Sequence, residues 1–173
     1  MRPLALTLTV FGALLRVLPH PPNFAPVGGT SLYSGARLRG WQAYLIPLAI
    51  MLATDPLLAA IYGFQAFSWT TPVIYACLMV NVWLGRTLRA SESAPRIATV
   101  AFLGSLQFFL ATNFMMWLRG TMYAHDLAGL VTCYVAALPF FGRTLLSDVL
   151  YCGFLFTAHA YLSRKAFPAE VAA

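Results

Sequence analysis

Long apolar runs alternate with short polar or proline-rich breaks along almost the whole chain. The clearest apolar spans cover residues 4–18, 41–62, 69–84, 97–118 and 144–162. A helix needs roughly 20 apolar residues to cross a bilayer core of about 30 Å. The first run is short for that length, so we expect it to tilt or to extend at its ends. This pattern predicts a protein with several membrane-spanning helices.

The first run also resembles the apolar part of a signal peptide. No small-x-small cleavage site follows it, and it ends in Pro19-His20-Pro21-Pro22. We therefore interpret it as a retained first helix.

Two further segments have a mixed character. Residues 23–38 are rich in Gly and Ser and predict a short second helix, which gives six spans. Residues 121–141 mix apolar and polar positions, with a proline near the end. Broken helices are tolerated at membrane depth only where they pack in protein or line a cavity. We therefore expect residues 121–141 to form a long, partly helical re-entrant segment on the outer side, before the last helix. A seventh full span is the alternative.

Composition supports a membrane protein and excludes other classes. The 173 residues are 60% hydrophobic and 9% charged, whereas soluble domains carry about 25% charged residues. An aromatic content of 14% excludes a disordered chain. The net charge of +6 does not indicate nucleic-acid binding, because the basic residues are scattered singly. We expect an all-α protein with a single transmembrane domain over residues 1–173.

The distribution of arginine and lysine predicts the orientation. With six spans and a cytoplasmic N-terminus, the cytoplasmic side carries Arg2, Arg37, Arg39, Arg86, Arg89, Arg96, Arg164 and Lys165, and the outer side carries Arg16, Arg119 and Arg143. This excess agrees with the positive-inside rule. Seven spans would move the C-terminal pair outward, which disfavours that alternative. Both termini are therefore expected in the cytoplasm.

Polar residues gather toward the outer ends of the predicted spans. They are His20, Asn23, Asp55, Gln65, Asn113, Tyr123, His125, Asp126 and Asp148. Ionisable groups within a membrane usually face a cavity or a partner, so this distribution indicates a site that opens outward. Asp55 and Asp148 are expected either to pair with Arg119 or Arg143 or to contact a substrate. His159 is expected to be a hydrogen-bonded packing residue.

Cys77 is the residue of greatest chemical interest. GxSxG, HExxH, P-loop and GxGxxG motifs are all missing from the sequence. Cys77 shares a helical face of small and mixed polarity with Thr70, Val73, Ile74, Asn81 and Leu84. Such a face suits a cavity wall better than a lipid contact. A thiol buried there would be inert unless a metal stabilised its thiolate form.

Three stretches resemble a known group of small bacterial membrane proteins. They are LPHPPNFAPVG at residues 18–28, ATNF at residues 111–114 and GLVTCYVAALPFF at residues 129–141. The chain resembles the substrate-binding S components of energy-coupling-factor vitamin transporters. An isolated cysteine in the fourth span, here Cys77, is typical of the solitary, BtuM-like cobalamin (vitamin B12) transporters, and in this feature the chain resembles them. The resemblance implies a six-helix bundle in the bacterial inner membrane with its substrate site facing outward.

The resemblance also implies a binding site. Cys77 would be the thiolate ligand of the cobalt, and His20, Asn23, Phe24 and Pro26 of the first loop and Tyr123, His125, Asp126 and Tyr134 of the fifth would contact the corrin ring and its amides. Asp55, Thr70 and Asn113 complete the expected substrate-binding set. Cobalamin is expected as the bound substrate, with no other cofactor. Donation by Cys77 would weaken the opposite cobalt bond, so cyanocobalamin would lose its cyanide.

The expected partners are the lipid bilayer and cobalamin, and a monomer is compatible with the sequence. S components that dock on an ATP-driven module usually carry an Ala-x-x-x-Ala step on the first helix. Here that helix offers only Ala5 and Thr9, and the alanine step lies at Ala49 and Ala53. This departure argues against dependence on such a module. The alternatives are an S-component-like transporter of another vitamin, an intramembrane enzyme that uses Cys77, and a structural or assembly protein.

Overall fold

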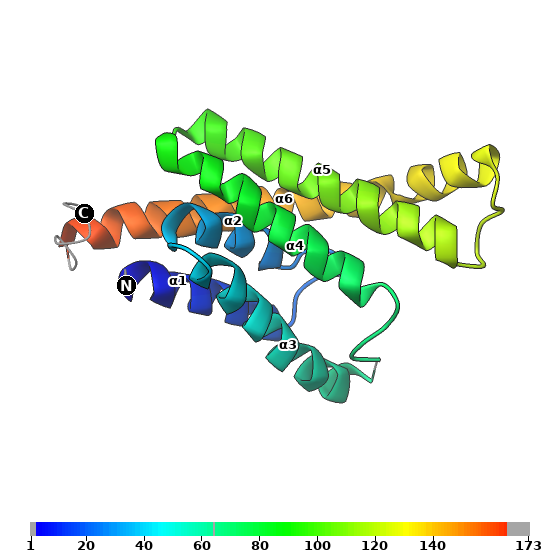
Figure 1. Ribbon diagram of the computed structural model, residues 1–173, viewed down its shortest axis with the longest axis horizontal. Helices are drawn as coiled ribbons and strands as arrows, with labels where there is room; N and C mark the ends of the chain where they lie inside the picture. Colours follow the sequence, from blue (N-terminus) through cyan, green and yellow to red (C-terminus); the bar gives the residue numbers. More distant parts are fainter. Residues whose placement is uncertain (1–2, 64, 166–173) are drawn as a thin grey trace.

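The computed structural model describes residues 3–63 and 65–165, and these residues fold into an all-helical bundle (Figure 1). Its elements are α1 (Pro3–Leu14), η1 (Leu15–Val17), α2 (Val27–Arg37), α3 (Gln42–Tyr62), α4 (Thr71–Arg86), η2 (Thr87–Ala90), α5 (Ala94–Arg119) and α6 (Leu127–Lys165). Within the described residues, α3, α5 and α6 are long and apolar enough to cross a membrane. The predictions of a helical membrane bundle and of a short second helix are confirmed.

The short helix α2 lies at the centre of the bundle. Its 11 residues extend for only about 16 Å, too short to cross the bilayer core. Every residue from Gly28 to Ala36 is buried, and the helix packs on all five other α-helices. Small Gly, Ser and Thr side chains allow neighbouring helices to approach closely. A segment poor in large apolar residues is therefore surrounded by protein and not by lipid.

The contact between α2 and α4 depends on two glycines, one on each helix, and each lies against the backbone of the other helix. A Cβ added to Gly35 would lie 1.9 Å from the carbonyl oxygen of Val82. A Cβ added to Gly85 would lie 2.0 Å from the carbonyl oxygen of Leu32. A larger residue at either position would push the two helices apart.

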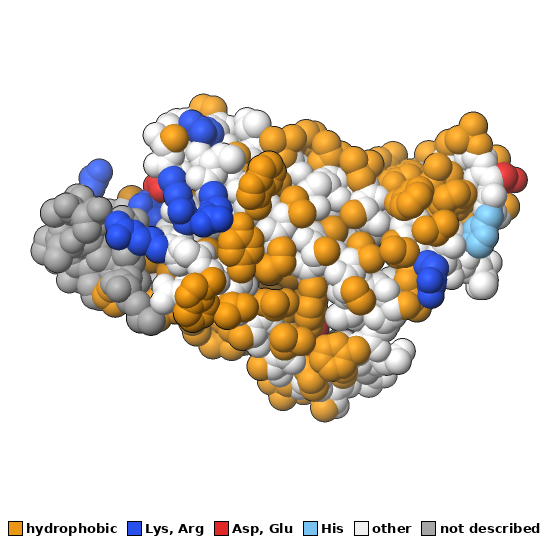
Figure 2. All heavy atoms as spheres, in the orientation of Figure 1, with side chains coloured by type: hydrophobic (Ala, Val, Ile, Leu, Met, Phe, Trp, Pro, Cys, Tyr) orange, Lys and Arg blue, Asp and Glu red, His pale blue; other side chains and the backbone are white. Residues whose placement is uncertain are grey.

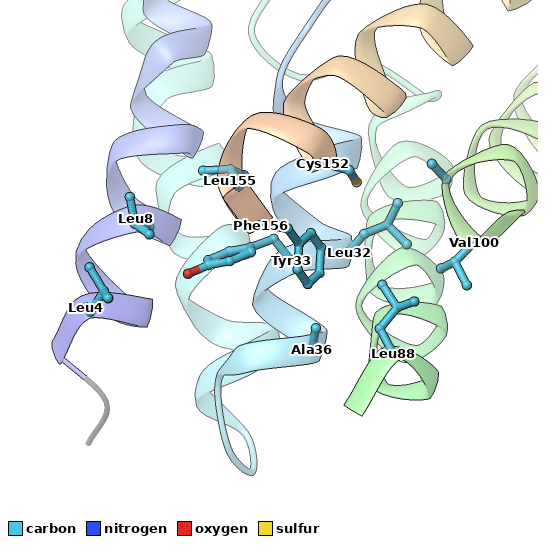
Figure 3. Close-up of a cluster of buried hydrophobic side chains, with 11 residues drawn as sticks. Leu4, Leu8, Leu32, Tyr33, Ala36, Leu88, Val100, Cys152, Leu155 and Phe156 are labelled. Carbon is cyan, nitrogen blue, oxygen red and sulfur yellow. The ribbon is translucent and has the colours of Figure 1, made fainter. Parts of the chain in front are cut away.

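A cluster of buried side chains joins α1, α2, α5, α6 and η2 (Figure 3). Its members are Leu4, Leu8, Leu32, Tyr33, Ala36, Leu88, Val100, Ala101, Cys152, Leu155 and Phe156. Within this cluster the Tyr33 hydroxyl lies 2.6 Å from Nδ1 of His159, and His159 itself is buried. The prediction that His159 is a hydrogen-bonded packing residue is confirmed.

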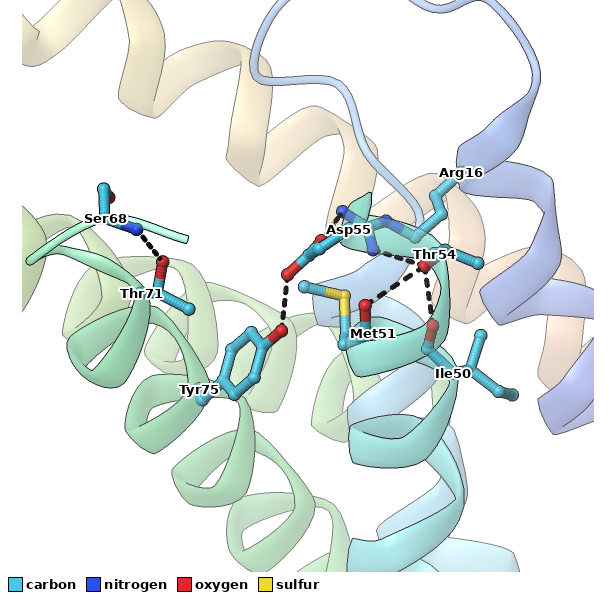
Figure 4. A network of polar contacts seen from close by, with 8 residues as sticks. All are labelled: Arg16, Ile50, Met51, Thr54, Asp55, Ser68, Thr71 and Tyr75. Carbon is cyan, nitrogen blue, oxygen red and sulfur yellow. Dashed lines mark hydrogen bonds and ion pairs between the residues drawn. The ribbon is translucent and has the colours of Figure 1, made fainter. Parts of the chain in front are cut away.

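A polar network connects η1, α3 and α4 (Figure 4). Arg16 forms an ion pair with Asp55 at 2.7 Å and donates to the Thr54 hydroxyl at 2.6 Å. The Tyr75 hydroxyl donates to the other oxygen of the Asp55 carboxylate. The expectation that Asp55 pairs with Arg119 or Arg143 is wrong. Because α3 packs on α1, α2 and α4, its carboxylate meets the arginine that follows α1.

The segment before the last span also differs from the prediction. Only residues 121–126 form a turn, and a single helix of 39 residues continues from Leu127 to Lys165 with Pro139 inside it. The expected re-entrant segment is therefore wrong, and residues 121–141 do not form a seventh span. Residues 127–141 continue α6 and pack along α5. A continuous helix keeps its backbone groups hydrogen-bonded, whereas a break in the helix at membrane depth would leave some of them without partners.

The helix α6 is longer than a bilayer core is thick. Its 39 residues extend for about 58 Å, against a core of roughly 30 Å. The α5–α6 hairpin accordingly reaches past the other helices at one end of the bundle, which we call the hairpin end (Figure 1). The start of α1 and the end of α6 lie at the opposite end, the terminal end (Figure 1).

Candidate functional site

A cavity of about 280 Å³ opens between α4, α5, α6 and the connection from η1 to α2. It is lined by Asn23, Thr70, Val73, Ile74, Phe108, Phe109, Thr112, Asn113, Met115, Met116, Ala137, Phe140, Phe141 and Thr144. We call it the aromatic cavity, because four phenylalanines contribute to its wall. The rings of Phe109 and Phe141 lie 5.0 Å apart, centroid to centroid, so α5 and α6 form one aromatic surface.

A second cavity of about 200 Å³ lies beside it, and we call it the carboxylate cavity. It is lined by Asn23, Ala25, Val27, Gly28, Leu78, Asn81, Phe108, Thr144 and Asp148. Asn23, Phe108 and Thr144 belong to both linings. The two cavities therefore adjoin, and together they form one candidate site with an aromatic part and an acidic part.

The connection between η1 and α2 is fixed over α6 by two hydroxyl groups. Thr144 donates to the carbonyl oxygen of Asn23 at 3.3 Å, and Ser147 donates to that of Ala25 at 2.9 Å. Asn23 has a φ of 62°, a left-handed conformation that Asn adopts more readily than most residues. This turn places Asn23 where both cavities meet.

Asp148 is a buried carboxylate that no arginine, lysine or histidine of the described residues neutralises. Its side chain is 2% exposed, accepts a hydrogen bond from the Ser105 hydroxyl at 2.7 Å, and accepts another from the backbone N–H of Gly29. Across residues 3–63 and 65–165, it forms no ion pair with an arginine, lysine or histidine. The expected pairing of Asp148 with Arg119 or Arg143 is therefore wrong as well.

Cys77 lies on the face of α4 that was predicted to wall a cavity. Thr70, Val73 and Ile74 of this face line the aromatic cavity, and Asn81 lines the carboxylate cavity. The prediction for this face is confirmed for these four residues, whereas Leu84 packs against the buried cluster instead. Cys77 itself is 3% exposed and belongs to neither lining. Along α4 it lies between Ile74 of the aromatic cavity and Leu78 of the carboxylate cavity, and the residue is buried without lining either.

The first-loop residues named by the resemblance divide between different places. Asn23 lines both cavities, whereas His20 is exposed and lines a separate cavity of about 350 Å³ beside the end of α3. The Phe24 ring packs 6.1 Å from the Tyr151 ring, and Pro26 is buried at the start of α2. Of these four residues, the structure brings only Asn23 into the candidate site.

The fifth-loop residues lie at the tip of the hairpin. His125 contacts the carbonyl oxygen of Gly120 at 3.1 Å, and the Asp126 carboxylate accepts the N–H of Gly129 at 2.7 Å, which caps α6. Asp126 precedes Ala137, the first α6 residue of the aromatic cavity, by eleven positions, about 16 Å along the helix. Tyr123 belongs to the same turn.

The remaining predicted residues are also divided. Thr70 and Asn113 line the aromatic cavity, whereas Asp55 belongs to the network with Arg16. The Tyr134 hydroxyl donates to the carbonyl oxygen of Leu110 at 2.8 Å, outside both linings. The sequence analysis did not single out Phe108, Phe109, Phe140 or Phe141. Each of these phenylalanines lies three or four residues from Thr112, Ala137 or Thr144, so it shares a helix face with a polar or small residue of the cavity wall. This spacing is the sequence signal that could have identified them.

The composition of the site bears on metal binding. In the part of the chain that the structure describes, no three His, Cys, Asp or Glu side chains come together as a metal site requires. The candidate site thus offers one carboxylate, several amides and hydroxyls, and an aromatic wall. This arrangement can bind an organic solute through apolar contact and a few directed hydrogen bonds.

A family model described as "Family of unknown function (DUF6580)" matches residues 1–170. The chain belongs to this family. No curated protein and no solved structure matches it. The family's description assigns no activity, so the function is inferred from the geometry and chemistry of the candidate site.

Proposed function

We propose that this protein is a substrate-binding membrane transporter that takes an organic solute across the bacterial inner membrane. The observation that carries the proposal is the pair of adjoining cavities between α4, α5, α6 and the Asn23 turn. Solute sites are typically concave and mostly apolar, with a few convergent polar groups. Asn23, Asn81, Thr144 and Asp148 supply such groups beside the aromatic wall.

The distribution of charge supports an outward-facing site. Lysine and arginine side chains gather toward the terminal end of the bundle (Figure 2). Arg37, Arg39 and Arg89 line a cleft there together with Glu92. By the positive-inside rule, this end faces the cytoplasm, and the hairpin end then faces outward. Reporter domains fused to either terminus test the orientation, because both should report a cytoplasmic location.

Cobalamin is the cargo that the resemblance implies, and Cys77 is the proposed cobalt ligand. The Cys77 thiol would lose its proton and donate an electron pair to cobalt in place of the vitamin's lower-face base. The cyanide would leave with both electrons of its cobalt bond and take up that proton as hydrogen cyanide, so the cobalt oxidation state would not change. Because Cys77 is buried and lines neither cavity, α4 would have to move for the sulfur to reach the metal.

An absorbance titration tests this ligand role. Wild-type protein should shift the cobalamin spectrum, and Cys77→Ala should not. Protein purified from cobalamin-fed cells should be coloured and contain one cobalt per chain. Identical spectra for the two proteins would remove the proposed ligand.

A smaller vitamin-like solute is a second candidate, favoured by the size of the cavities. Their volumes are about 280 and 200 Å³, each below the roughly 300–1,000 Å³ typical of pockets for drug-sized ligands. A corrin with its amide side chains and nucleotide loop exceeds this range. A ligand that binds only the native state raises its stability. A thermal-unfolding panel of cobalamin and smaller solutes therefore distinguishes the candidates, and a protein that no solute stabilises would contradict the proposal.

The surface of α1 supports a solitary transporter. Ala5 and Thr9, the small residues of the first helix, are both fully buried within the bundle. An ATP-driven partner could not pack against them, although Ala49 and Ala53 of α3 are exposed. Uptake in cells that lack an energy-coupling module tests this point, because a solitary transporter keeps its activity there.

A further inference from the structure

We propose that the Asp148 carboxylate binds a positively charged nitrogen of the solute, so that the cargo is a small organic cation with an apolar or aromatic body. This inference rests on the proposed transport function and specifies the cargo class of the same site.

Asp148 lacks a counter-charge among the described residues. A carboxylate within a membrane bundle is costly and normally pairs with a cation or faces a functional cavity. Asp55, the other buried carboxylate, is neutralised by Arg16 at 2.7 Å. Among the described residues, Asp148 has only the Ser105 hydroxyl and the Gly29 N–H as partners, yet it lines a cavity. A cationic ligand would supply the charge that the described residues do not.

Contacts from two other helices hold the Asp148 carboxylate in place. Its partners come from α2 and α5, while Asp148 itself belongs to α6. A Cβ added to Gly28 would lie 2.2 Å from Oδ1 of Asp148, so α2 approaches the carboxylate as closely as a glycine allows. Such a group is held in a fixed position before a ligand arrives, which lowers the entropy cost of binding.

An aromatic wall lies beside the Asp148 carboxylate. Phe108 lines both cavities, and the rings of Phe109 and Phe141 continue the aromatic surface outward. Aromatic faces attract cations and also bury apolar groups. A cation with an aromatic body would place its nitrogen toward Asp148 and its ring against the phenylalanines.

The experiment compares benzylammonium with benzyl alcohol, which has a similar shape but no charge. Both are titrated at neutral pH into the detergent-solubilised full-length protein, and binding is measured by calorimetry. We expect benzylammonium to bind about tenfold more tightly or better. Asp148→Asn should abolish this preference. Asp126→Asn, which removes an exposed carboxylate at the hairpin tip, should retain it.

Equal affinity of the wild-type protein for the two probes would overturn the inference while leaving a solute site in place. This comparison uses the wild-type protein alone, so its result does not depend on whether the Asp148→Asn variant folds. A preference that survives in Asp148→Asn would overturn it too. If neither probe binds, the inference fails, and the solute panel described above decides separately whether the transport function fails with it.

Discussion

Two buried carboxylates of the same bundle have different surroundings. Asp55 meets the guanidinium of Arg16 at 2.7 Å and also accepts a hydrogen bond from Tyr75. Asp148 accepts hydrogen bonds only from the Ser105 hydroxyl and the Gly29 N–H among the described residues. The first joins η1, α3 and α4, whereas the second lines a cavity between α2, α4, α5 and α6.

The difference in charge compensation is consistent with a structural role for Asp55 and with the binding role proposed for Asp148. Transfer of a charge out of water has a large free-energy cost, which a nearby opposite charge offsets. Asp55 obtains that compensation within the chain, so it fixes the ends of helices. Asp148 has no such compensation among the described residues and is held by hydrogen bonds from Ser105 and Gly29, which leaves its charge available to a cationic ligand. The predictions below test this distinction, from the largest expected effect to the smallest.

Arg16→Met should lower the free energy of unfolding by about 3 kcal/mol or more, because it leaves Asp55 as an uncompensated buried charge. Equilibrium unfolding in detergent measures the change. The double variant Arg16→Met/Asp55→Leu should recover most of the loss, since it removes both charges. A single variant as stable as wild type would mean that the pair contributes nothing to the fold.

Gly35→Ala should cost about 1–3 kcal/mol, the usual range for overpacking. The new Cβ would lie 1.9 Å from the carbonyl oxygen of Val82, which α4 can relieve only by moving. Gly153→Ala is the matched control, because a Cβ there meets no atom within 4 Å, and it should be neutral or slightly stabilising. Comparable losses in both variants would argue against close packing of α2 on α4.

Asp126→Ala should cost about 1 kcal/mol, the usual value of a helix N-cap. The carboxylate caps α6 through the N–H of Gly129 and lies far along the helix from both cavities. Solute affinity should therefore be unchanged, which titration with any bound solute checks. A clear loss of affinity would indicate that the hairpin tip belongs to the binding site, as the resemblance implies.

Asp148→Asn should change the free energy of unfolding by less than about 1 kcal/mol. The amide oxygen still accepts a hydrogen bond, and the Ser105 hydroxyl can accept one from the new amide group, while a buried charge disappears. The same unfolding measurement applies. A loss as large as that of Arg16→Met would show that Asp148 is a structural residue and not a binding residue.

Much of the bundle could be predicted from local sequence. The apolar runs at residues 41–62 and 97–118 correspond to α3 (Gln42–Tyr62) and α5 (Ala94–Arg119). The face of α4 around Cys77 was correctly predicted to wall a cavity, since Thr70 and Asn81 line the two cavities. Both results depend on helical spacing, which is a property of neighbouring residues.

Other features could not be predicted in this way. The mixture of polar and apolar residues at 121–141 looked like a broken helix, yet residues 127–141 continue α6 because α5 packs along them. Tyr123, His125 and Asp126 shared an expected loop with Tyr134, but the long hairpin keeps them away from both cavities. The partner of Asp55 could not be identified either, since Arg16 is 39 residues away in sequence.

The sequence by itself determined an all-helical membrane protein with one short, small-residue helix, because span length, hydropathy and charge bias are local properties of the chain. Only the tertiary structure decided which polar residues meet. The glycine contacts set how closely α2 approaches α4. The packing of α3 on α1 gives Asp55 its arginine, whereas Asp148 on α6 faces a cavity. A counter-charge acts over a few ångströms in space, and no distance along the sequence determines which residue comes that near.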